Sequence, residues 1–279
     1  MIRPYRSVLY LPASNARALE KARGLPVDAV ILDLEDAVAP AEKPAARDAL
    51  AAALGLDWGR RARLVRINGL DTEWGEADAR ALAEGPDGVL IPKVGSPADL
   101  DRAAGLIPDT PLWAMMETVA GMLNATAIAA HPRLAGMVMG TNDLGHELGI
   151  RPRADRRGVM TSLGLCLLAA RAHGRVILDG VYNAFRDEAG LLAECAQGRD
   201  LGFDGKTLIH PAQIGPANTV FGPSAGEIDL ARRQIAAFAE AEAEGRGVAV
   251  LDGRIVENLH VETARRTLAL AEAIAAGQG

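Results

Sequence analysis

Short apolar runs alternate with helical segments along the chain, and most runs stop at polar residues. Strands are expected over residues 6–12, 28–38, 63–69, 87–94, 111–116, 134–140, 175–182 and 203–211. The segments between them carry the spacing of amphipathic helices. Eight strand–helix units in strict alternation predict parallel strands closed into a (β/α)8 TIM barrel. The chain has 279 residues, 49% of them hydrophobic, which is enough for one such barrel.

The C-terminal residues continue beyond the eighth unit and predict an extension. Residues 227–245 read as a helix that closes the barrel, residues 247–256 as a hairpin around Asp252-Gly253, and residues 257–276 as an amphipathic helix. We therefore divide the chain into a barrel core, 1–226, and an extension, 227–279. A lone hairpin and helix are not stable alone, so the extension must pack on the barrel or on another subunit.

Charge and composition narrow the classes of function. The net charge is −6 with acids and bases interspersed, which disfavours a nucleic-acid surface. No apolar run reaches the roughly 18 residues of a membrane span, and the N-terminus lacks the long apolar core of a signal peptide. Cys166 and Cys195 have no metal-type spacing and are expected to be buried and reduced. We expect a cytoplasmic enzyme without membrane or nucleic-acid partners.

Two carboxylates, Glu117 and Asp143, follow two successive predicted strands. The C-terminal ends of parallel strands lie side by side on the face where α/β barrels place their chemistry. Two hard oxygen ligands completed by water or substrate oxygens suit Mg²⁺. The structural alternative is that these residues cap helices, which is more plausible for Asp143 than for Glu117.

Other polar residues also stand at predicted strand ends: Glu35, Asp36, Arg66, Lys93, Asp179 and His210. A charge such as Arg66 at the end of a strand core is costly unless it is paired. Arg66 can bind a substrate carboxylate or thioester oxygen with its planar fork, or it can form a salt bridge to Glu35 or Asp36. Glu35 and Asp36 can hold metal-bound waters, while Asp36 can also be a helix cap.

The sequence does not support a phosphate-binding loop or a zinc site. Residues 202–207, GFDGKT, lack the first glycine of a phosphate-binding loop and precede a strand instead of a helix. The five histidines show no i, i+4 pair for zinc.

Several long motifs together resemble the citrate lyase β-subunit-like family of CoA-ester enzymes. They are residues 6–38, AMMET at 114–118, GTNDLG at 140–145 and GFDGKTLIHPAQI at 202–214. The resemblance implies a TIM barrel that uses Mg²⁺, with Mn²⁺ as a substitute, on acyl-CoA thioesters. It implies Glu117 and Asp143 as metal ligands, Arg66 as the substrate-binding arginine, Asn142 beside them in the substrate site, and Glu35 and Asp36 as the acidic pair near the metal.

The C-terminal segment indicates which reaction to expect. Lyases of this family carry an aspartate after the hairpin that reaches a neighbouring subunit's site, whereas Glu257 occupies that position here and Leu259 replaces a following proline. Residues 164–174 and 179–188 resemble those of family members that hydrolyse (3S)-malyl-CoA to (S)-malate and CoA. The resemblance therefore implies a thioesterase and a homo-oligomer, trimer or hexamer, with Glu257 as a candidate base. The alternative for Glu257 is a first-turn residue favoured by the helix dipole.

Three other functions stay open. One is a carbon–carbon lyase for malyl-, β-methylmalyl- or citramalyl-CoA. Another is a subunit of a citrate-lyase-type complex, which the C-terminal extension disfavours. The last is a phosphoenolpyruvate-type barrel enzyme, which also uses Glu and Asp on Mg²⁺. Product analysis with malyl-CoA and Mg²⁺ separates the first from hydrolysis.

Overall fold

Eight parallel strands form a closed barrel in chain order, which confirms the predicted fold. The computed structural model describes residues 3–82 and 85–277. The strands are β1 (Ser7–Pro12), β2 (Ala29–Asp33), β3 (Ala62–Arg66), β4 (Gly88–Ile91), β5 (Leu112–Met116), β6 (Leu134–Met139), β7 (Val176–Asp179) and β8 (Gly205–Leu208). Pairing of β1 with both β2 and β8 closes the ring.

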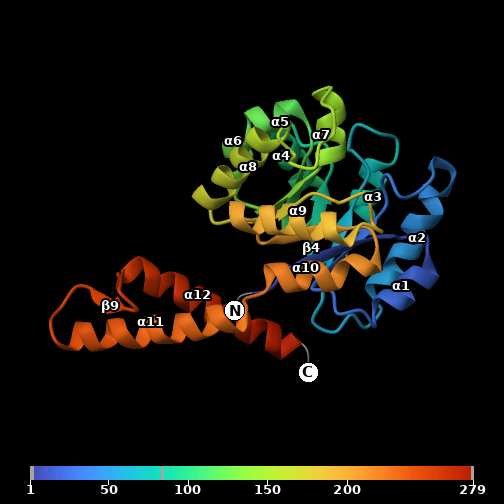
Figure 1. Cartoon of the computed structure of the whole chain (residues 1–279). Coiled ribbons are helices and arrows are strands. Elements are labelled where there is room, and N and C mark those ends of the chain that lie inside the picture. Colours follow the sequence, from blue (N-terminus) through green and yellow to red (C-terminus); the bar gives the residue numbers. More distant parts are fainter. Residues whose placement is uncertain (1–2, 83–84, 278–279) are drawn as a thin grey trace. The chain divides into compact units, whose positions relative to one another are not determined.

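Helices follow the strands and surround the barrel (Figure 1). They are α1 (Ala16–Ala22), α2 (Lys43–Leu54), α3 (Gly75–Ala81), α4 (Pro97–Leu106), α5 (Val119–Leu123), α6 (Ala125–Ala129), α7 (Thr141–Glu147), α8 (Met160–Ala172), α9 (Glu188–Leu201) and α10 (Ile214–Phe221), with short 3₁₀ turns at Pro40–Glu42 and Pro211–Gln213. The segment after β5 forms two short helices that share Asn124, where one helix was expected. The segment directly after β6 is the short helix α7.

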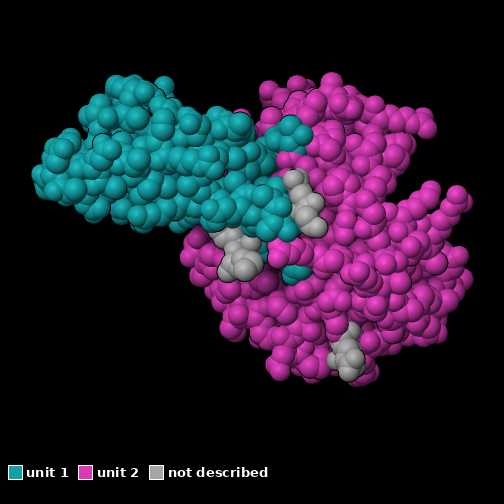
Figure 2. All heavy atoms as spheres, turned by 90° about the horizontal axis from the view of Figure 1, so that it is seen from below, with its two compact units in different colours: residues 1–4, 219–279 teal, residues 5–218 magenta. Residues whose placement is uncertain are grey.

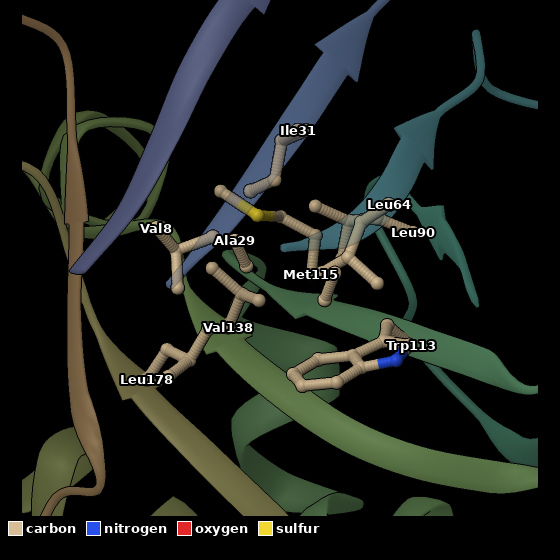
Figure 3. Packing of buried hydrophobic residues seen from close by; sticks show 10 residues of the cluster. Val8, Ala29, Ile31, Leu64, Leu90, Trp113, Met115, Val138 and Leu178 are labelled. Carbon is tan, nitrogen blue, oxygen red and sulfur yellow. The ribbon is translucent and has the colours of Figure 1, made fainter. Parts of the chain in front are cut away.

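The barrel interior is filled by side chains that alternate along each strand. The cluster includes Val8, Ile31, Leu64, Trp113 and Val138, all at most 1% exposed (Figure 3). Because side chains point to alternate faces of a strand, every second residue faces this core and the residues between them face the helices. The inner column of each strand is therefore a row of positions two residues apart.

Trp113 fits into the interior because two flanking strands present glycine. A Cβ atom on Gly88 of β4 would lie 2.6 Å from Trp113 Nε1, and one on Gly136 of β6 would lie 2.4 Å from Trp113 Cζ3. Gly136 is the direct partner of Trp113 in the β5–β6 register. The ring of Tyr5 meets the indole edge-on at a centroid distance of 5.3 Å. The aromatic side chain thus occupies volume that glycine leaves empty.

The chain divides into two compact units, residues 5–218 and residues 1–4 with 219–279 (Figure 2). The second unit contains α11 (Ala225–Ala243), the hairpin β9 (Ala249–Leu251) and β10 (Arg254–Val256), and α12 (Asn258–Gly277). Ser224 caps α11 in a capping box with Glu227. A small core of Ala241, Ala249, Val256 and Val261 holds the hairpin to the two helices. The predicted hairpin and final helix are confirmed as elements.

Both cysteines, Cys166 and Cys195, are free and buried as expected. Burial raises the pKa of the Cys166 thiol to about 12, so it behaves as a small apolar side chain. No helix within the described residues is long and apolar enough to cross a membrane.

The glycine opposite Trp113 gives a stability test. We expect Gly136→Ala to destabilise the protein by about 2 kcal/mol, because overpacking a filled core costs roughly 1–3 kcal/mol. Gly105→Ala is the matched control, since a Cβ there meets nothing within 4 Å and alanine favours the helix α4. The measurement is the midpoint of denaturant unfolding. A Gly136→Ala protein as stable as wild type would show that the interior accommodates the methyl group.

Candidate metal centre

Charged residues continue the apolar inner columns at the C-terminal ends of β2, β3 and β5. In β3, Ala62 and Leu64 of the core are followed at the same spacing by Arg66. In β5, Trp113 and Met115 are followed by Glu117. The alternation that buries the apolar side chains therefore brings the charged ones together at the mouth of the barrel.

Arg66 is held by a bidentate ion pair with Asp33. Its Nε donates to Asp33 Oδ1 at 2.7 Å and its Nη2 donates to Oδ2 at 2.6 Å, with both side chains almost fully buried. The guanidinium also lies over the ring of Tyr10, 4.9 Å from its centroid. Burial opposes the charge of Arg66, but the hydrogen bonds that it donates to Asp33 and the surrounding negative charge outweigh burial and raise its pKa. Arg66 is thus a permanent cation.

The third nitrogen of Arg66 faces the acidic pair predicted from the sequence. Nη1 lies 2.9 Å from Glu35 Oε2 and 3.5 Å from Asp36 Oδ2. The salt-bridge alternative for Arg66 placed it beside these acids, and the structure shows both ion pairs. Asp36 is half exposed and does not cap a helix, because the following 3₁₀ turn begins after Ala39.

Asp33 and Lys43 fix the segment that carries Glu35, and neither was predicted to have a role in the site. Asp33 accepts hydrogen bonds from the backbone N–H groups of Glu35 and Ala37. Lys43 is buried and donates to the carbonyl oxygens of Leu34 and Glu35 at 3.0 and 2.8 Å. The spacing of Asp33 was a usable signal, because it stands two residues before Glu35 in the inner column of β2.

Lys93 joins the two sides of the site. Its backbone N–H donates to Glu117 Oε1 at 2.8 Å, and its Nζ lies 3.5 Å from Glu35 Oε1 and 3.9 Å from Asp143 Oδ1. Glu117 and Asp143, predicted as a pair, therefore share the neighbour Lys93. Neither acts as a helix cap, since Thr118 caps α5 and Gly140 precedes the first residue of α7.

A glycine makes room for the Glu117 carboxylate. A Cβ atom on Gly140 would lie 2.4 Å from Glu117 Cβ and 2.5 Å from Glu117 Oε2. Gly140 follows β6 directly, and its N–H donates to the carbonyl of Met116. The start of α7, with Asp143 in its first turn, can therefore lie directly beside Glu117.

The acids at this site are under electrostatic strain. Burial, together with the charges of Glu35 and Asp143, raises the pKa of Glu117 to about 7, although the hydrogen bond from the Lys93 N–H lowers it. Burial likewise raises the pKa of Glu35 to about 7, against the attraction of Arg66. Glu35 Oε2 is buried without a hydrogen bond, although Arg66 Nη1 lies within ion-pair distance. Additional positive charge would stabilise this arrangement.

These residues fit a magnesium ion better than a metal held only by protein. Within the described residues, no group of three or more His, Cys, Asp or Glu side chains is arranged to bind a metal. Mg²⁺ typically takes one or two carboxylates and keeps waters or substrate oxygens for its remaining positions. Glu117 and Asp143 supply such a pair of oxygen donors, and the orphaned Glu35 oxygen can receive a hydrogen bond from water.

The other predicted residues, Asn142, Glu257 and His210, contact residues outside the charged cluster around Arg66 and Glu117. Asn142 exchanges hydrogen bonds with Asn183 of the loop after β7, at 2.8 and 3.3 Å, which ties α7 to that loop. Glu257 lies in the C-terminal unit and immediately precedes α12, where its N–H donates to His260 Nδ1. His210 stacks on Phe185 and lines a cavity of about 410 Å³.

Asp179 belongs to a separate buried ion network on the outer side of β7 and β8. It accepts hydrogen bonds from Arg156 at 2.7 Å and Lys206 at 3.0 Å, and Lys206 also pairs with Glu194 of α9. Burial opposes ionisation of Asp179, but Lys206 and Arg156 outweigh it and lower its pKa. The network attaches α9 and the segment before α8 to the barrel.

The chain belongs to the HpcH/HpaI aldolase/citrate lyase family, whose model matches residues 6–211. It is 68% identical to a (3S)-malyl-CoA thioesterase of Cereibacter sphaeroides strain KD131, over 98% of this chain and 96% of that protein. It is 34% identical to the L-malyl-CoA/beta-methylmalyl-CoA lyase of Cereibacter sphaeroides strain ATCC 17029, over 98% of this chain and 96% of that protein. These findings confirm the family resemblance drawn from the motifs.

A solved structure is similar over almost the whole chain. The protein CitE from Mycobacterium tuberculosis, in complex with magnesium, acetoacetate and coenzyme A, superposes with a TM-score of 0.81 at 35% identity. The match covers 95% of this chain and 97% of that chain.

The Asp179 network predicts a purely structural phenotype. We expect Asp179→Asn to lower the free energy of unfolding by about 3 kcal/mol, because breaking a buried ion pair leaves its partners uncompensated. Glu20→Gln, which breaks the exposed pair with Arg23, is the control and should cost less than about 0.5 kcal/mol. Denaturant unfolding measures both. Equal stabilities for the two variants would contradict this interpretation.

Proposed function

We propose that this chain hydrolyses (3S)-malyl-CoA to (S)-malate and CoA in a Mg²⁺-dependent reaction. The observation that carries the proposal is the 68% identity to a (3S)-malyl-CoA thioesterase across nearly the full length of both chains. The barrel mouth supports it with a pair of acids that fits Mg²⁺ and with the buried cation Arg66. The similar structure of CitE with magnesium and coenzyme A supports the same cofactor and an acyl-CoA substrate.

Glu117 and Asp143 would hold the Mg²⁺. When bound, the ion supplies Lewis acidity for negative charge that develops on substrate oxygens. Glu35, whose buried Oε2 pairs with Arg66 but makes no hydrogen bond, would accept one from water. Asp36 extends this acidic side toward solvent, and Asn142 lies beside Asp143 to contact the substrate. Mn²⁺, which also accepts carboxylate and water ligands, is expected to substitute.

Arg66 would stabilise the transition state of hydrolysis. In that reaction a water oxygen bonds to the thioester carbon, the carbon–sulfur bond breaks, and the CoA thiolate takes up a proton. Negative charge develops on the thioester oxygen, and a fixed cation nearby lowers its energy. Asp33 keeps Arg66 in one orientation, so little reorganisation is needed when that charge appears.

Glu257 is the proposed base that separates hydrolysis from carbon–carbon cleavage. The exposed side chain lies at the start of α12, in the C-terminal unit. A glutamate in place of the family's lyase aspartate moves the carboxylate by about one carbon–carbon bond, and proton transfer requires hydrogen-bond reach of roughly 2.6–3.2 Å. We infer that the displaced base activates water instead of promoting the formation of an enolate.

We propose a homo-oligomer, trimer or hexamer, in which the C-terminal unit covers a neighbour's site, and exposed apolar residues of that unit support an interface. Val250 and Ile255 face each other across the hairpin and are 67% and 61% exposed, and the nearby Leu259 is 58% exposed. Exposed apolar side chains on one short hairpin and the helix start that follows it are typical of a surface that another subunit buries.

Product analysis tests the reaction. Wild type with malyl-CoA and Mg²⁺ should release CoA and malate with little acetyl-CoA or glyoxylate, and EDTA should abolish the reaction.

Two variants test the residue roles. Asp143→Asn should lose at least about a hundredfold in kcat/KM through lost charge stabilisation. Glu257→Ala should also slow hydrolysis but leave Mg²⁺ affinity unchanged. Stoichiometric acetyl-CoA and glyoxylate from wild type would establish a lyase instead.

Light scattering tests the assembly. We expect wild type to be an oligomer and Ile255→Glu to dissociate it, because a buried unpaired charge is costly at an interface. Leu168→Glu on α8 is the matched control, since that leucine is also exposed and lies on the barrel unit. A fully active wild-type monomer would exclude the proposed arrangement.

A further inference from the structure

Lys93 occupies a backbone conformation that favours glycine. Its φ is +53°, in the left-handed region that costs a residue with a side chain roughly 1 kcal/mol or more. Gly88 and Leu90 belong to the inner column of β4, so regular alternation would direct Pro92, and not Lys93, toward the interior. The left-handed turn changes this direction and brings the Lys93 ammonium to the acids of the barrel mouth.

The ammonium of Lys93 lies near the carboxylates of Glu35 and Asp143 and is still accessible to solvent. Nζ is 3.5 Å from Glu35 Oε1 and 3.9 Å from Asp143 Oδ1, and the side chain is 52% exposed. Neither contact reaches ordinary hydrogen-bond length, so both are ion pairs at a distance. Such a cation can change partners without breaking a tight hydrogen bond.

Arg66 is much less available to an incoming anion. Its side chain is 8% exposed, both arms of its fork are engaged by Asp33, and its remaining nitrogen faces Glu35 and Asp36. A substrate carboxylate that used this fork would have to replace Asp33. A half-exposed lysine next to Asp143 therefore offers a less costly partner for a carboxylate.

We propose that Lys93 is a substrate-positioning residue that moves away from Asp143 when Mg²⁺ binds and pairs with the free carboxylate of the malyl group. The inference rests on the proposed function, because it assigns a partner to one group of that substrate. It explains why a strained lysine stands where glycine would be less costly: the strain places a mobile cation beside the metal ligands.

Two variants separate the ammonium from the backbone. Lys93→Met keeps the length of the side chain and removes its charge. Lys93→Gly also removes the charge, but it suits the left-handed φ and keeps the N–H that donates to Glu117. Arg80→Gln on α3 is the control, because it removes one exposed positive charge whose partner in the described contacts is the exposed Glu76.

The first measurement is Mg²⁺ affinity by titration calorimetry without substrate. Removing a cation from beside Asp143 should tighten Mg²⁺ binding about three- to tenfold in both Lys93 variants, and the control should stay within twofold. Unchanged or weaker Mg²⁺ binding in both variants would overturn the proposal, because the ammonium would then not compete with the ion.

The second measurement compares two ligands in the presence of Mg²⁺. In 3-hydroxybutyryl-CoA of matching configuration a methyl group replaces the free carboxylate of malyl-CoA. Both Lys93 variants should raise KM for malyl-CoA about tenfold or more and change the Kd of 3-hydroxybutyryl-CoA less than twofold. Equal losses for both ligands would show a merely structural role and overturn the proposal. Cleavage to acetyl-CoA and glyoxylate by wild type would refute the proposed reaction but leave this difference between ligands intact.

Discussion

The ion pair between Arg66 and Asp33 is the interaction on which the barrel mouth depends. Two buried charges in contact are stable only with near-ideal geometry and further hydrogen bonds, and here the fork is bidentate while Asp33 also accepts two backbone N–H groups. Those two bonds shape the segment that carries Glu35 and Asp36. One pair thus fixes a cation in place and positions the acids around it.

Carboxylates that lie close together repel one another and need nearby positive charge, which Arg66 and Lys93 provide at different degrees of burial. Arg66 is buried and makes short contacts, whereas Lys93 is half exposed and makes longer ones. The pKa of Glu117 is nevertheless raised to about 7, because burial and neighbouring carboxylates disfavour its charge. A divalent cation bound beside Glu117 would stabilise that charge. In the proposed enzyme, one fixed cation, one mobile cation and one bound ion would share the negative charge of the site and substrate.

Glycines provide the space for this arrangement. Gly136 leaves room for Trp113 in the barrel interior, and Gly140, four residues later, leaves room for the Glu117 carboxylate. Gly136 belongs to the inner column of β6 and Gly140 continues that column directly after the strand, so one stretch of chain accommodates a core side chain and a metal-ligand candidate. A methyl group at either position would displace its neighbour, since protein interiors are close-packed.

The sequence by itself determined the barrel and the residues at its mouth, because strand alternation is a local property. Leu64 followed by Arg66, and Met115 followed by Glu117, stand at the two-residue spacing that assigns them to one face. The tertiary structure alone decided which charges pair. Asp33 binds the Arg66 fork and Asp179 turns outward to Lys206, and these contacts join residues that are 33 and 27 positions apart in the sequence. The left-handed turn at Lys93 also required the structure, because a lysine gives no local signal for a positive φ.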